Sequence, residues 1–309
     1  MTPQTAVKRS ENMKKTAFIA IVGRPNVGKS TLLNAMLGEK VAIVSSKPQT
    51  TRNRITGILT RGEEQFVFLD TPGIHNPRTK LGDYMVKSAE NSIGDCDAVI
   101  LIADADKPAG NVERAVIERI KKEKIPAVLV LNKIDQSDPV KLAETITDYA
   151  SIHNFDAVVP TSALKGKGVS DVLDEVGKFL REEEWYFSGD EITDQSERRY
   201  AAEVIREKML RLLSKEIPHG TAVVVEEFKD ENTLIRIRAE IYCEKNTHKG
   251  IILGKNGEML KKIGTYARED LERFFGCKVF LDLWVKVKDG WRDRGGYLRD
   301  FGYDIKELK

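Results

Sequence analysis

Short apolar runs alternate with helix-compatible stretches over the first 184 residues. The strand-length runs are rich in Val, Ile, Leu and Phe and lie at 18–22, 66–69, 98–103, 127–131 and 158–160. Runs of this length and composition are typical of strands that are buried on both faces of a sheet. Helical patterns between these runs lie at 29–37, 111–124 and 169–184. The alternation predicts a doubly wound α/β domain whose sheet is mostly parallel.

An acidic, polar segment from Glu182 to Glu197 interrupts any hydrophobic period. Beyond it the pattern changes to the order helix, strand, strand, helix, helix, strand. The first helix lies at 198–213, the strands at 221–228, 234–244 and 278–288, and the two consecutive helices with their loop at 249–275. The strands of this second region alternate apolar and polar residues, as strands of a half-exposed sheet do. We therefore predict an N-terminal tail at 1–15, a first domain at 16–183, a linker at 184–197 and a second domain with a C-terminal extension at 198–309.

The composition supports two domains, because 309 residues with 41% hydrophobic content exceed one typical core. The formal net charge of +2 argues against a strongly basic nucleic-acid binder only if the charge is spread evenly. Residues 1–197 contain 26 basic and 29 acidic side chains, a net −3, whereas residues 198–309 contain 24 and 19, a net +5. The near-neutral total therefore hides a basic second half.

The three cysteines, Cys96, Cys243 and Cys277, are far apart in the sequence. This spacing suits neither a zinc cluster nor a disulfide framework, so we expect a reducing, intracellular setting. The sequence also has no apolar segment near the roughly 20 residues that a membrane-spanning helix requires. We expect a protein that is neither exported nor integral to a membrane.

Residues 23–30, Gly-Arg-Pro-Asn-Val-Gly-Lys-Ser, match the pattern GxxxxGK[ST] between a predicted strand and a predicted helix. In this context the glycines let the backbone wrap around phosphates, and free amides and the helix dipole favour negative charge. We expect Lys29 to bridge the β- and γ-phosphates and the Ser30 hydroxyl to bind Mg²⁺. The candidate phosphate-binding residues, including one glycine from the next motif, are Gly23, Asn26, Val27, Gly28, Lys29, Ser30, Thr31 and Gly73.

Three further motifs follow predicted strands in chain order. Asp70-Thr-Pro-Gly73 places a carboxylate to act on Mg²⁺ through a water, and a glycine amide near the γ-phosphate. Asn132-Lys133-Ile-Asp135 supplies a carboxylate that can accept from both N1–H and the exocyclic amine of guanine, a donor pair that adenine lacks. Thr161-Ser162-Ala163 supplies the Ala163 amide for guanine O6. The candidate base-binding residues are Asn132, Lys133, Asp135, Ser162 and Ala163.

This four-part set resembles the GTPases of the Ras-like superfamily, and the resemblance implies GTP and GDP as ligands and Mg²⁺ as cofactor. The loop Lys47-Pro-Gln-Thr-Thr-Arg52 resembles the first switch segment of the TrmE-Era-EngA branch. In that branch the threonine before the arginine binds the metal when the γ-phosphate is present, which favours Thr51 over Thr50. The resemblance thus implies a metal site of Ser30, Thr51 and Asp70. It implies the switch residues Thr50, Thr51, Asp70, Gly73 and Ile74.

Hydrolysis requires an in-line water and stabilisation of the transferring phosphoryl group. Ras-like enzymes place a glutamine after the glycine of the second motif, whereas this chain has Ile74, so another side chain, the backbone, a partner or water must orient the nucleophile. The adjacent His75 is either a solvated switch residue, which we favour, or a group that orients water. In related GTPases with an asparagine at the position of Asn26, its oxygen helps to bind a monovalent cation, so the resemblance also implies K⁺ stimulation.

In the second region, Gly254-Lys-Asn-Gly257 forms a GxxG loop between apolar helical segments. With the order helix, strand, strand, helix, helix, strand, this loop is typical of a type II KH domain, an α+β fold that binds RNA. The glycines let a sugar-phosphate backbone pass closely and the lysines attract phosphate, so we expect single-stranded RNA as ligand, bound more weakly at high salt. The candidate RNA-binding residues are Lys249, Ile251, Ile252, Gly254, Lys255, Asn256, Gly257 and Lys261.

The stretch 290–299 adds aromatic and basic groups, among them Trp291 and Tyr297. These rings either contact RNA or pack a terminal helix onto the domain, and the sequence leaves both readings open.

A Ras-like GTPase domain with this switch loop, an acidic linker and a type II KH domain is together similar to the Era family of bacterial GTPases, over residues 16–290. The resemblance implies hydrolysis of GTP to GDP and phosphate, binding near the 3′ end of small-subunit ribosomal RNA, and assistance in small-subunit assembly. It further implies a monomer in the cytoplasm with peripheral association with the inner membrane. The alternative is a GTP-regulated membrane or cell-division adaptor whose KH-like domain binds protein or lipid.

Overall fold

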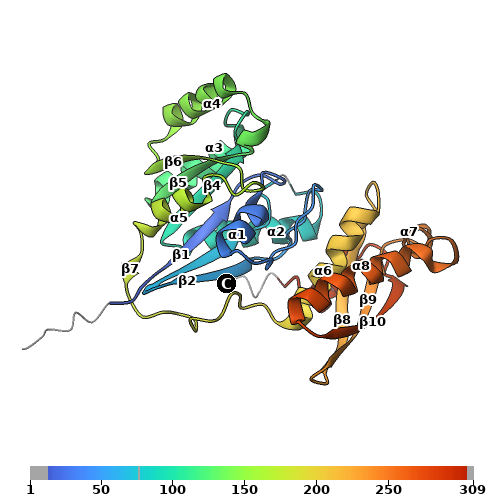
Figure 1. Cartoon of the computed structure of the whole chain (residues 1–309). Coiled ribbons are helices and arrows are strands. Elements are labelled where there is room, and N and C mark those ends of the chain that lie inside the picture. The colour runs from blue at the N-terminus through green and yellow to red at the C-terminus, as the bar shows by residue number, and fades with distance from the viewer. Residues whose placement is uncertain (1–12, 76, 305–309) are drawn as a thin grey trace, which may run out of the picture.

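The computed structural model describes residues 13–75 and 77–304, which form two units with a sheet each (Figure 1). Residues 1–12 of the predicted tail and residues 305–309 of the predicted C-terminal extension lie outside the described residues. In the part of the chain that is described, no helix is both long enough and apolar enough to cross a membrane.

The first unit contains a sheet with α-helices on both faces. Its strands are β1 (Lys15–Val22), β2 (Ile55–Arg61), β3 (Glu64–Asp70), β4 (Ala98–Asp104), β5 (Ala127–Asn132), β6 (Ala157–Thr161) and the short β7 (Arg181–Glu182). Its helices are α1 (Lys29–Leu37), α2 (Lys80–Gly94), α3 (Asn111–Glu123), α4 (Pro139–Ile152) and α5 (Val169–Gly177), with one 3-10 turn, η1 (Ile134–Gln136). The strand order is β2-β3-β1-β4-β5-β6, and β1, β3, β4, β5 and β6 are parallel.

Burial on both faces explains the apolar runs. Every residue of β4 and of β5 is buried. One apolar cluster fills the space between the sheet and α1 and α5, and another the space between the sheet and α2, α3 and α4. The prediction of a doubly wound, mostly parallel sheet is confirmed.

The helix predicted at 169–184 is wrong in length. It ends at Gly177, because residues 181–182 leave the helix and pair antiparallel with the start of β1. Strand β2 was not predicted either. It pairs antiparallel with β3 and contains Gly57, whose missing side chain makes room for Leu33 of α1.

The second unit confirms the predicted order of elements. It consists of α6 (Glu197–Leu212), η2 (Pro218–Gly220), β8 (Thr221–Asp230), β9 (Leu234–Cys243), α7 (Asn246–Leu253), η3 (Lys255–Gly257), α8 (Glu258–Phe275), β10 (Lys278–Val287), η4 (Trp291–Asp293) and α9 (Gly295–Asp300). The sheet order is β10-β9-β8, with β10 parallel and β8 antiparallel to β9. One apolar cluster joins the sheet to α6, α7 and α8, which leaves the opposite face of the sheet uncovered by these helices.

The connection between the units lies along the first sheet (Figure 1). The Ile58 amide donates to Ile192 O at 2.9 Å, and the Thr193 hydroxyl donates to Thr56 O at 2.7 Å. The predicted linker at 184–197 is therefore fixed against edge strand β2.

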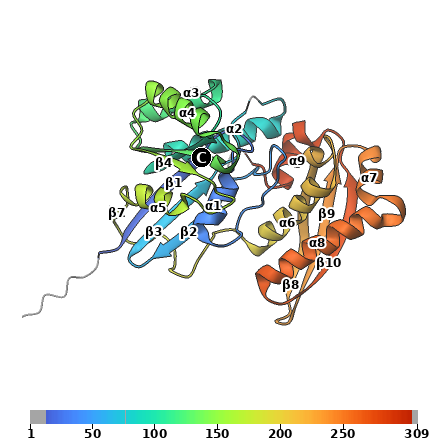
Figure 2. The same cartoon turned by 45° about the horizontal axis from the view of Figure 1, so that its top comes forward.

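The units also share an apolar cluster. It combines the start of α2 with the C-terminal extension of the second unit, and α9 lies beside α2 in Figure 2. Its buried members are Leu81, Tyr84, Met85, Ala222, Tyr242, Trp291, Leu298 and Tyr303. The rings of the extension pack rather than face solvent, because Trp291 is fully buried and its indole N–H donates to Gly220 O at 3.0 Å.

Candidate functional sites

The phosphate loop connects β1 to α1 at the carboxyl end of the parallel strands. Gly28 has a φ of 106°, and a Cβ there would lie 2.2 Å from Nδ2 of Asn132. Only glycine fits this position, because the backbone is left-handed and the base-side loop packs directly on it. The Asn132 Nδ2 group donates to Val27 O at 2.7 Å, so a side chain at the end of β5 holds the phosphate loop in place.

Lys29 lies buried at the start of α1. Its Nζ donates to Arg24 O at 2.9 Å and to Gly23 O at 3.3 Å. Burial lowers the pKa of Lys29 to about 8, although the charge of Asp70 opposes this shift. A buried cation held only by carbonyl oxygens is ready to be paired with an anion such as phosphate.

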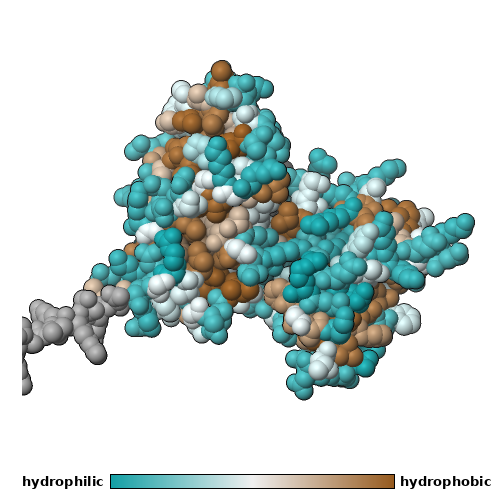
Figure 3. Space-filling model, in the orientation of Figure 1, coloured by the Kyte–Doolittle hydropathy of each residue, from teal (hydrophilic) through white to brown (hydrophobic). Residues whose placement is uncertain are grey.

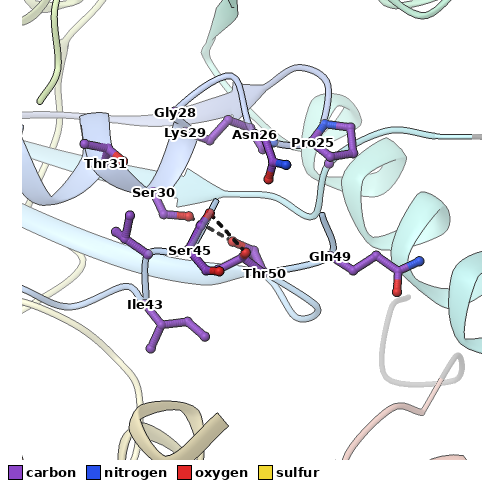
Figure 4. Close-up of a pocket in the computed structure, with 13 residues that line it drawn as sticks. Pro25, Asn26, Gly28, Lys29, Ser30, Thr31, Ile43, Ser45, Gln49 and Thr50 are labelled. Carbon is purple, nitrogen blue, oxygen red and sulfur yellow. Dashed lines mark hydrogen bonds between the residues drawn. The ribbon is translucent and has the colours of Figure 1, made fainter. Parts of the chain in front are cut away.

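A cavity opens between the phosphate loop and the switch loop (Figure 4). Eight predicted residues line it: Asn26, Gly28, Lys29, Ser30, Thr31, Thr50, Thr51 and Gly73. Five further lining residues were not predicted: Pro25, Ile43, Val44, Ser45 and Gln49. Pro25 and Gln49 lie at variable positions of the phosphate-loop and switch motifs, and no motif marks the other three. The predicted residues Gly23, Val27, Asp70 and Ile74 are not among the lining residues.

Three predicted metal ligands converge beside this cavity. The Ser30 hydroxyl donates to Asp70 Oδ2 at 2.6 Å and lies 2.9 Å from the Thr51 hydroxyl, which donates to the same carboxylate oxygen at 3.2 Å. The second oxygen, Asp70 Oδ1, is buried without a hydrogen-bond partner among the described residues. Burial raises the pKa of Asp70, and the nearby Lys29 charge reduces the shift without cancelling it.

The two switch threonines point to different partners. The Thr50 hydroxyl donates to Lys47 O at 2.7 Å within its own loop, whereas the Thr51 hydroxyl contacts Ser30 and Asp70. This geometry favours Thr51 as the residue at the metal position.

Neither of the two residues after Gly73 lines the cavity. The Ile74 side chain packs against the apolar cluster on the α3 face of the sheet, and its amide donates to Gly23 O at 3.2 Å. His75 Nδ1 lies 2.8 Å from Gly73 O, and its Nε2 lies 3.5 Å from Nε2 of Gln49. Because Ile74 is packed, its side chain has no role in orienting water.

The base-side motifs form one connected loop system. The Ala163 amide donates to Asn132 Oδ1 at 2.9 Å, and the Ser162 hydroxyl donates to Asp135 Oδ1 at 2.6 Å. This hydrogen bond from Ser162 lowers the pKa of the exposed Asp135, so the carboxylate stays ionised. All five predicted base-binding residues thus belong to the same edge of the sheet, at the ends of β5 and β6.

Lys133 is held by a residue that the sequence did not single out. Its Nζ lies 2.7 Å from Asp104 Oδ1 at the end of β4 and donates to Asn26 O at 2.6 Å. Burial opposes ionisation of Asp104, but hydrogen bonds from Lys107 and Lys133 keep its pKa below the usual range. A carboxylate at the end of a buried parallel strand was the signal that could have identified it.

The second unit holds the switch loop from two sides. The fully buried guanidinium of Arg52 donates to Thr221 O of β8 at 2.6 Å and to His219 O of η2 at 2.7 Å. In return Arg206 of α6, also buried, donates to the carbonyl oxygens of Gln49 and Thr50. The backbone on either side of the metal-side threonine therefore depends on the position of the second unit.

The GxxG loop links α7 to α8 through η3. Gly254 has a φ of 73°, and a Cβ there would lie 2.7 Å from Cβ of Met259, so a side chain at this position would clash with α8. A groove of about 370 Å³ follows the loop, between α8 and the helix-side residues of β10. Its lining residues are Gly257, Leu260, Lys261, Gly264, Thr265, Arg268, Leu281 and Leu283.

The predicted RNA-binding residues divide into three groups. Exposed residues around the loop are Ile251, Lys255, Asn256 and Lys261, and partly buried ones are Lys249, Gly254 and Gly257. Ile252 is wrong as a contact residue, because its side chain is fully buried in the core of the second unit. Leu281 and Leu283 instead supply an apolar floor. Sequence reasoning missed them because they come from β10, more than 20 residues away.

Two family matches cover the two units. Residues 18–133 match the family described as 50S ribosome-binding GTPase, and residues 216–292 match the KH domain family. Among relatives, the chain is 52% identical to the GTPase Era of Clostridium kluyveri over 292 residues, which span 94% of this chain and 100% of that protein. It is 50% identical to the GTPase Era of Clostridium botulinum strain Okra over 298 residues, 96% of this chain and 100% of that protein.

Two solved structures share the whole arrangement. One is Era in complex with MgGDPNP and nucleotides 1506–1542 of 16S ribosomal RNA, with a TM-score of 0.90 and 40% identity over 94% of this chain and 100% of that one. The other is an Aquifex aeolicus Era variant bound to GDP and AlF4⁻, with the same TM-score, identity and coverage.

Proposed function

The chain belongs to the Era family of GTPases, and on that premise we propose that it binds RNA near the 3′ end of small-subunit ribosomal RNA and assists assembly of that subunit as a GTP-driven switch. The observation that carries the proposal is that a guanine-nucleotide cleft and a GxxG groove occur in one chain, with the second unit holding the switch loop. The relative solved with both MgGDPNP and 16S ribosomal RNA supports both ligands.

In this proposal the cleft binds GTP through its phosphates and its base. Lys29 pairs with the β- and γ-phosphates, and its pKa rises again when the anion restores the charged form. Asp135 accepts from the two guanine donors. Asn132 holds the phosphate loop and the loop of Ala163 together through its two hydrogen bonds. Guanine is selected because adenine would leave the carboxylate unpaired.

The donor set fits Mg²⁺. Hydroxyl and carboxylate oxygens are the ligands this ion prefers, and Ser30, Thr51 and Asp70 present them within hydrogen-bond distance of one another. The unpartnered Asp70 Oδ1 and the raised pKa of Asp70 mark a carboxylate that a cation would stabilise. When bound, Mg²⁺ would neutralise charge on the β- and γ-phosphate oxygens.

Since Ile74 cannot orient water, we extend the proposal to K⁺ at Asn26. The amide nitrogen of Asn26 donates to Ser46 O at 2.7 Å, so this side chain connects the phosphate loop to the residue just before the switch loop. A monovalent cation bound by the side-chain oxygen of Asn26 would stabilise charge on the transferring phosphoryl group. Exchange of KCl for NaCl in a hydrolysis assay tests this point, since equal rates in both salts would remove K⁺ from the mechanism.

The groove takes single-stranded RNA. Gly254 and Gly257 let the backbone approach, the exposed Lys255 and Lys261 pair with phosphates, and Leu281 and Leu283 support unstacked bases. We also propose that the chain acts as a monomer in the cytoplasm with peripheral contact to the inner membrane, on the basis of family membership alone.

The test is RNA binding by the intact chain in two nucleotide states. Affinity for a fragment from the 3′ end of small-subunit ribosomal RNA is measured with GDP and with a non-hydrolysable GTP analogue, for the natural chain and for Gly254→Asp. We expect tighter binding with the GTP analogue, and roughly tenfold or greater loss in the variant, because its carboxylate repels phosphate and its Cβ meets α8. Lys178→Asp, an exposed charge reversal on the first unit, is the control. Equal affinity in both nucleotide states would contradict the proposal that the nucleotide switches RNA binding. Full affinity of Gly254→Asp would contradict the proposal that RNA binds in the groove.

A further inference from the structure

We propose that the open face of the second unit's sheet is a second RNA-binding surface, on which Phe280 and Trp284 of β10 stack nucleotides that leave the groove. We call this surface, formed by Phe280, Trp284, Arg236 and Arg238, the aromatic face. The proposal rests on the proposed binding of RNA in the groove and extends it across strand β10.

Both rings are unusually exposed for their size. Phe280 is 54% exposed and Trp284 is 58% exposed. Because they are four residues apart on a strand, they lie on the same face, roughly 13 Å apart along the chain. Of the residues between them, Leu281 and Leu283 belong to the other face and contact the core of the unit, whereas Asp282 shares the face of the rings. Large apolar side chains gathered on one face mark an interaction surface.

Basic groups accompany the rings. The guanidinium of Arg236 lies 5.5 Å from the centre of the Phe280 ring. Arg238 is exposed and pairs in register with Asp282, between the two rings. Its guanidinium forms no hydrogen bond or ion pair with a residue that the structure describes, although Glu227 and Glu240 lie close enough to interact with its charge. An exposed arginine between two aromatic rings can meet a phosphate while the bases stack.

The acidic groups on this face are already engaged. Asp282 accepts from the indole N–H of Trp284 at 2.8 Å, and Glu240 is paired with Lys286. Glu227, opposite Arg238 on β8, is paired with Lys229 at 2.7 Å. Arg238 therefore remains available for an incoming anion, as does the exposed Lys278 on the same face of β10, because neither side chain forms an ion pair with a described residue.

The aromatic face continues the groove. Leu281 and Leu283 line the groove, and Phe280 and Trp284 alternate with them on the same strand. β10 is an edge strand of the sheet, so among the described residues no further strand separates the two surfaces. In Figure 3 apolar surface lies over the strands of the second unit, below the hydrophilic surface over α8. A KH groove accommodates about four nucleotides, so a longer strand that crosses β10 reaches the rings.

Stacking rings with arginines favour RNA over a protein partner as the occupant. Bases stack on aromatic side chains whatever their sequence, and arginine supplies both charge and a planar partner. Truncation of one stacking ring is expected to weaken binding about tenfold.

The experiment compares a short RNA of about five nucleotides, which fills the groove alone, with one of about twelve, which extends beyond it. The variants of the full chain are Trp284→Ala, Trp284→Phe and Gly254→Asp, with Tyr186→Ala as the control because Tyr186 is 49% exposed on the connection between the units. We expect Trp284→Ala to weaken the long RNA about tenfold and to leave the short one unchanged, while Trp284→Phe keeps most of the affinity. The long RNA should also quench tryptophan fluorescence, and this signal should fall in Trp284→Phe.

The outcomes separate the two proposals. If Gly254→Asp binds both RNAs normally but Trp284→Ala weakens the long one, the groove assignment fails and the aromatic face stands. If Trp284→Ala binds the long RNA as well as the natural chain does, the aromatic face is overturned. Unchanged RNA binding together with weaker association with isolated small ribosomal subunits would overturn it in favour of a protein partner.

Discussion

The nucleotide cleft and the groove of the second unit both suit a polyanion, but they are built in opposite ways. In the cleft, the cation Lys29 is buried and held by two carbonyl oxygens, and the metal-side oxygens already contact one another. In the groove, Lys255 and Lys261 are exposed, and the positive charge is spread over a unit with a net +5.

This difference predicts how each site responds to its surroundings. Salt screens exposed charges within about 8 Å at physiological ionic strength but acts much less on buried ones. RNA binding should therefore weaken steeply with salt and tolerate single substitutions of lysine, whereas nucleotide binding should depend on single atoms. The following changes test this comparison.

The sharpest test of single-atom dependence is Asp135→Asn. The substitution places an amide where guanine N1–H and the exocyclic amine need an acceptor, so GDP affinity should fall roughly 100-fold and preference should shift toward xanthine nucleotides. Asp138→Asn is the matched control, because Asp138 caps α4 nearby and asparagine caps equally well. Equilibrium binding of labelled GDP and XDP gives both affinities. Retained guanine preference would contradict the assignment of Asp135.

A second change tests whether the two regions are independent. Arg206→Lys keeps the charge beside Glu203 but loses the forked hydrogen bonding to the carbonyl oxygens of Gln49 and Thr50. The ratio of RNA affinities with the GTP analogue and with GDP should shrink about tenfold, because the hydrogen bonds that couple the switch backbone to α6 are lost.

Lys40→Ala is the comparison for this experiment. Lys40 also crosses between the units, to Glu207 and Asp270 at 2.8 and 2.9 Å, but does not contact the switch carbonyls. Thermal unfolding with GDP bound verifies that both variants fold. An unchanged affinity ratio in Arg206→Lys, with both variants folded, would show that coupling does not pass through this contact.

The two regions also differ in how well the sequence predicts them, because the cleft is built from local motifs and the contacts of the second unit join distant segments. The phosphate loop and α1 are local, so their pattern fixes 29–37 as a helix, and the structure has the same bounds. Thr51 was favoured over Thr50 from the residue that follows it, and the geometry agrees. Motifs that act through consecutive backbone atoms carry their own structure.

Contacts between distant segments left no such pattern. Ile252 stands in an apolar run with Ile251, and only the packing of α7 on the sheet decides that one is buried and the other exposed. Likewise, nothing near Arg206 in sequence indicates the switch loop, which is 156 residues away. Tertiary packing supplies this information, and a single sequence does not contain it in local form.

The smallest expected effect concerns the charge of Lys29 and bears on whether the cleft is poised for an anion. With a pKa of about 8 in the nucleotide-free fold against 10.5 for an ordinary lysine, Lys29 loses its proton in the folded chain first. The unfolded chain then binds more protons between these values, so the nucleotide-free chain gains stability as pH rises from about 8 to 10.5. Phosphate binding must restore the proton, so GDP affinity should fall about threefold between pH of about 7.5 and 8.5. Guanosine, which lacks phosphates, is the control for titration of the base, and the ratio of the two affinities isolates Lys29. If GDP and guanosine weaken in parallel, the ammonium group is already fully charged before the phosphates arrive, and the cleft does not differ from the groove in this respect.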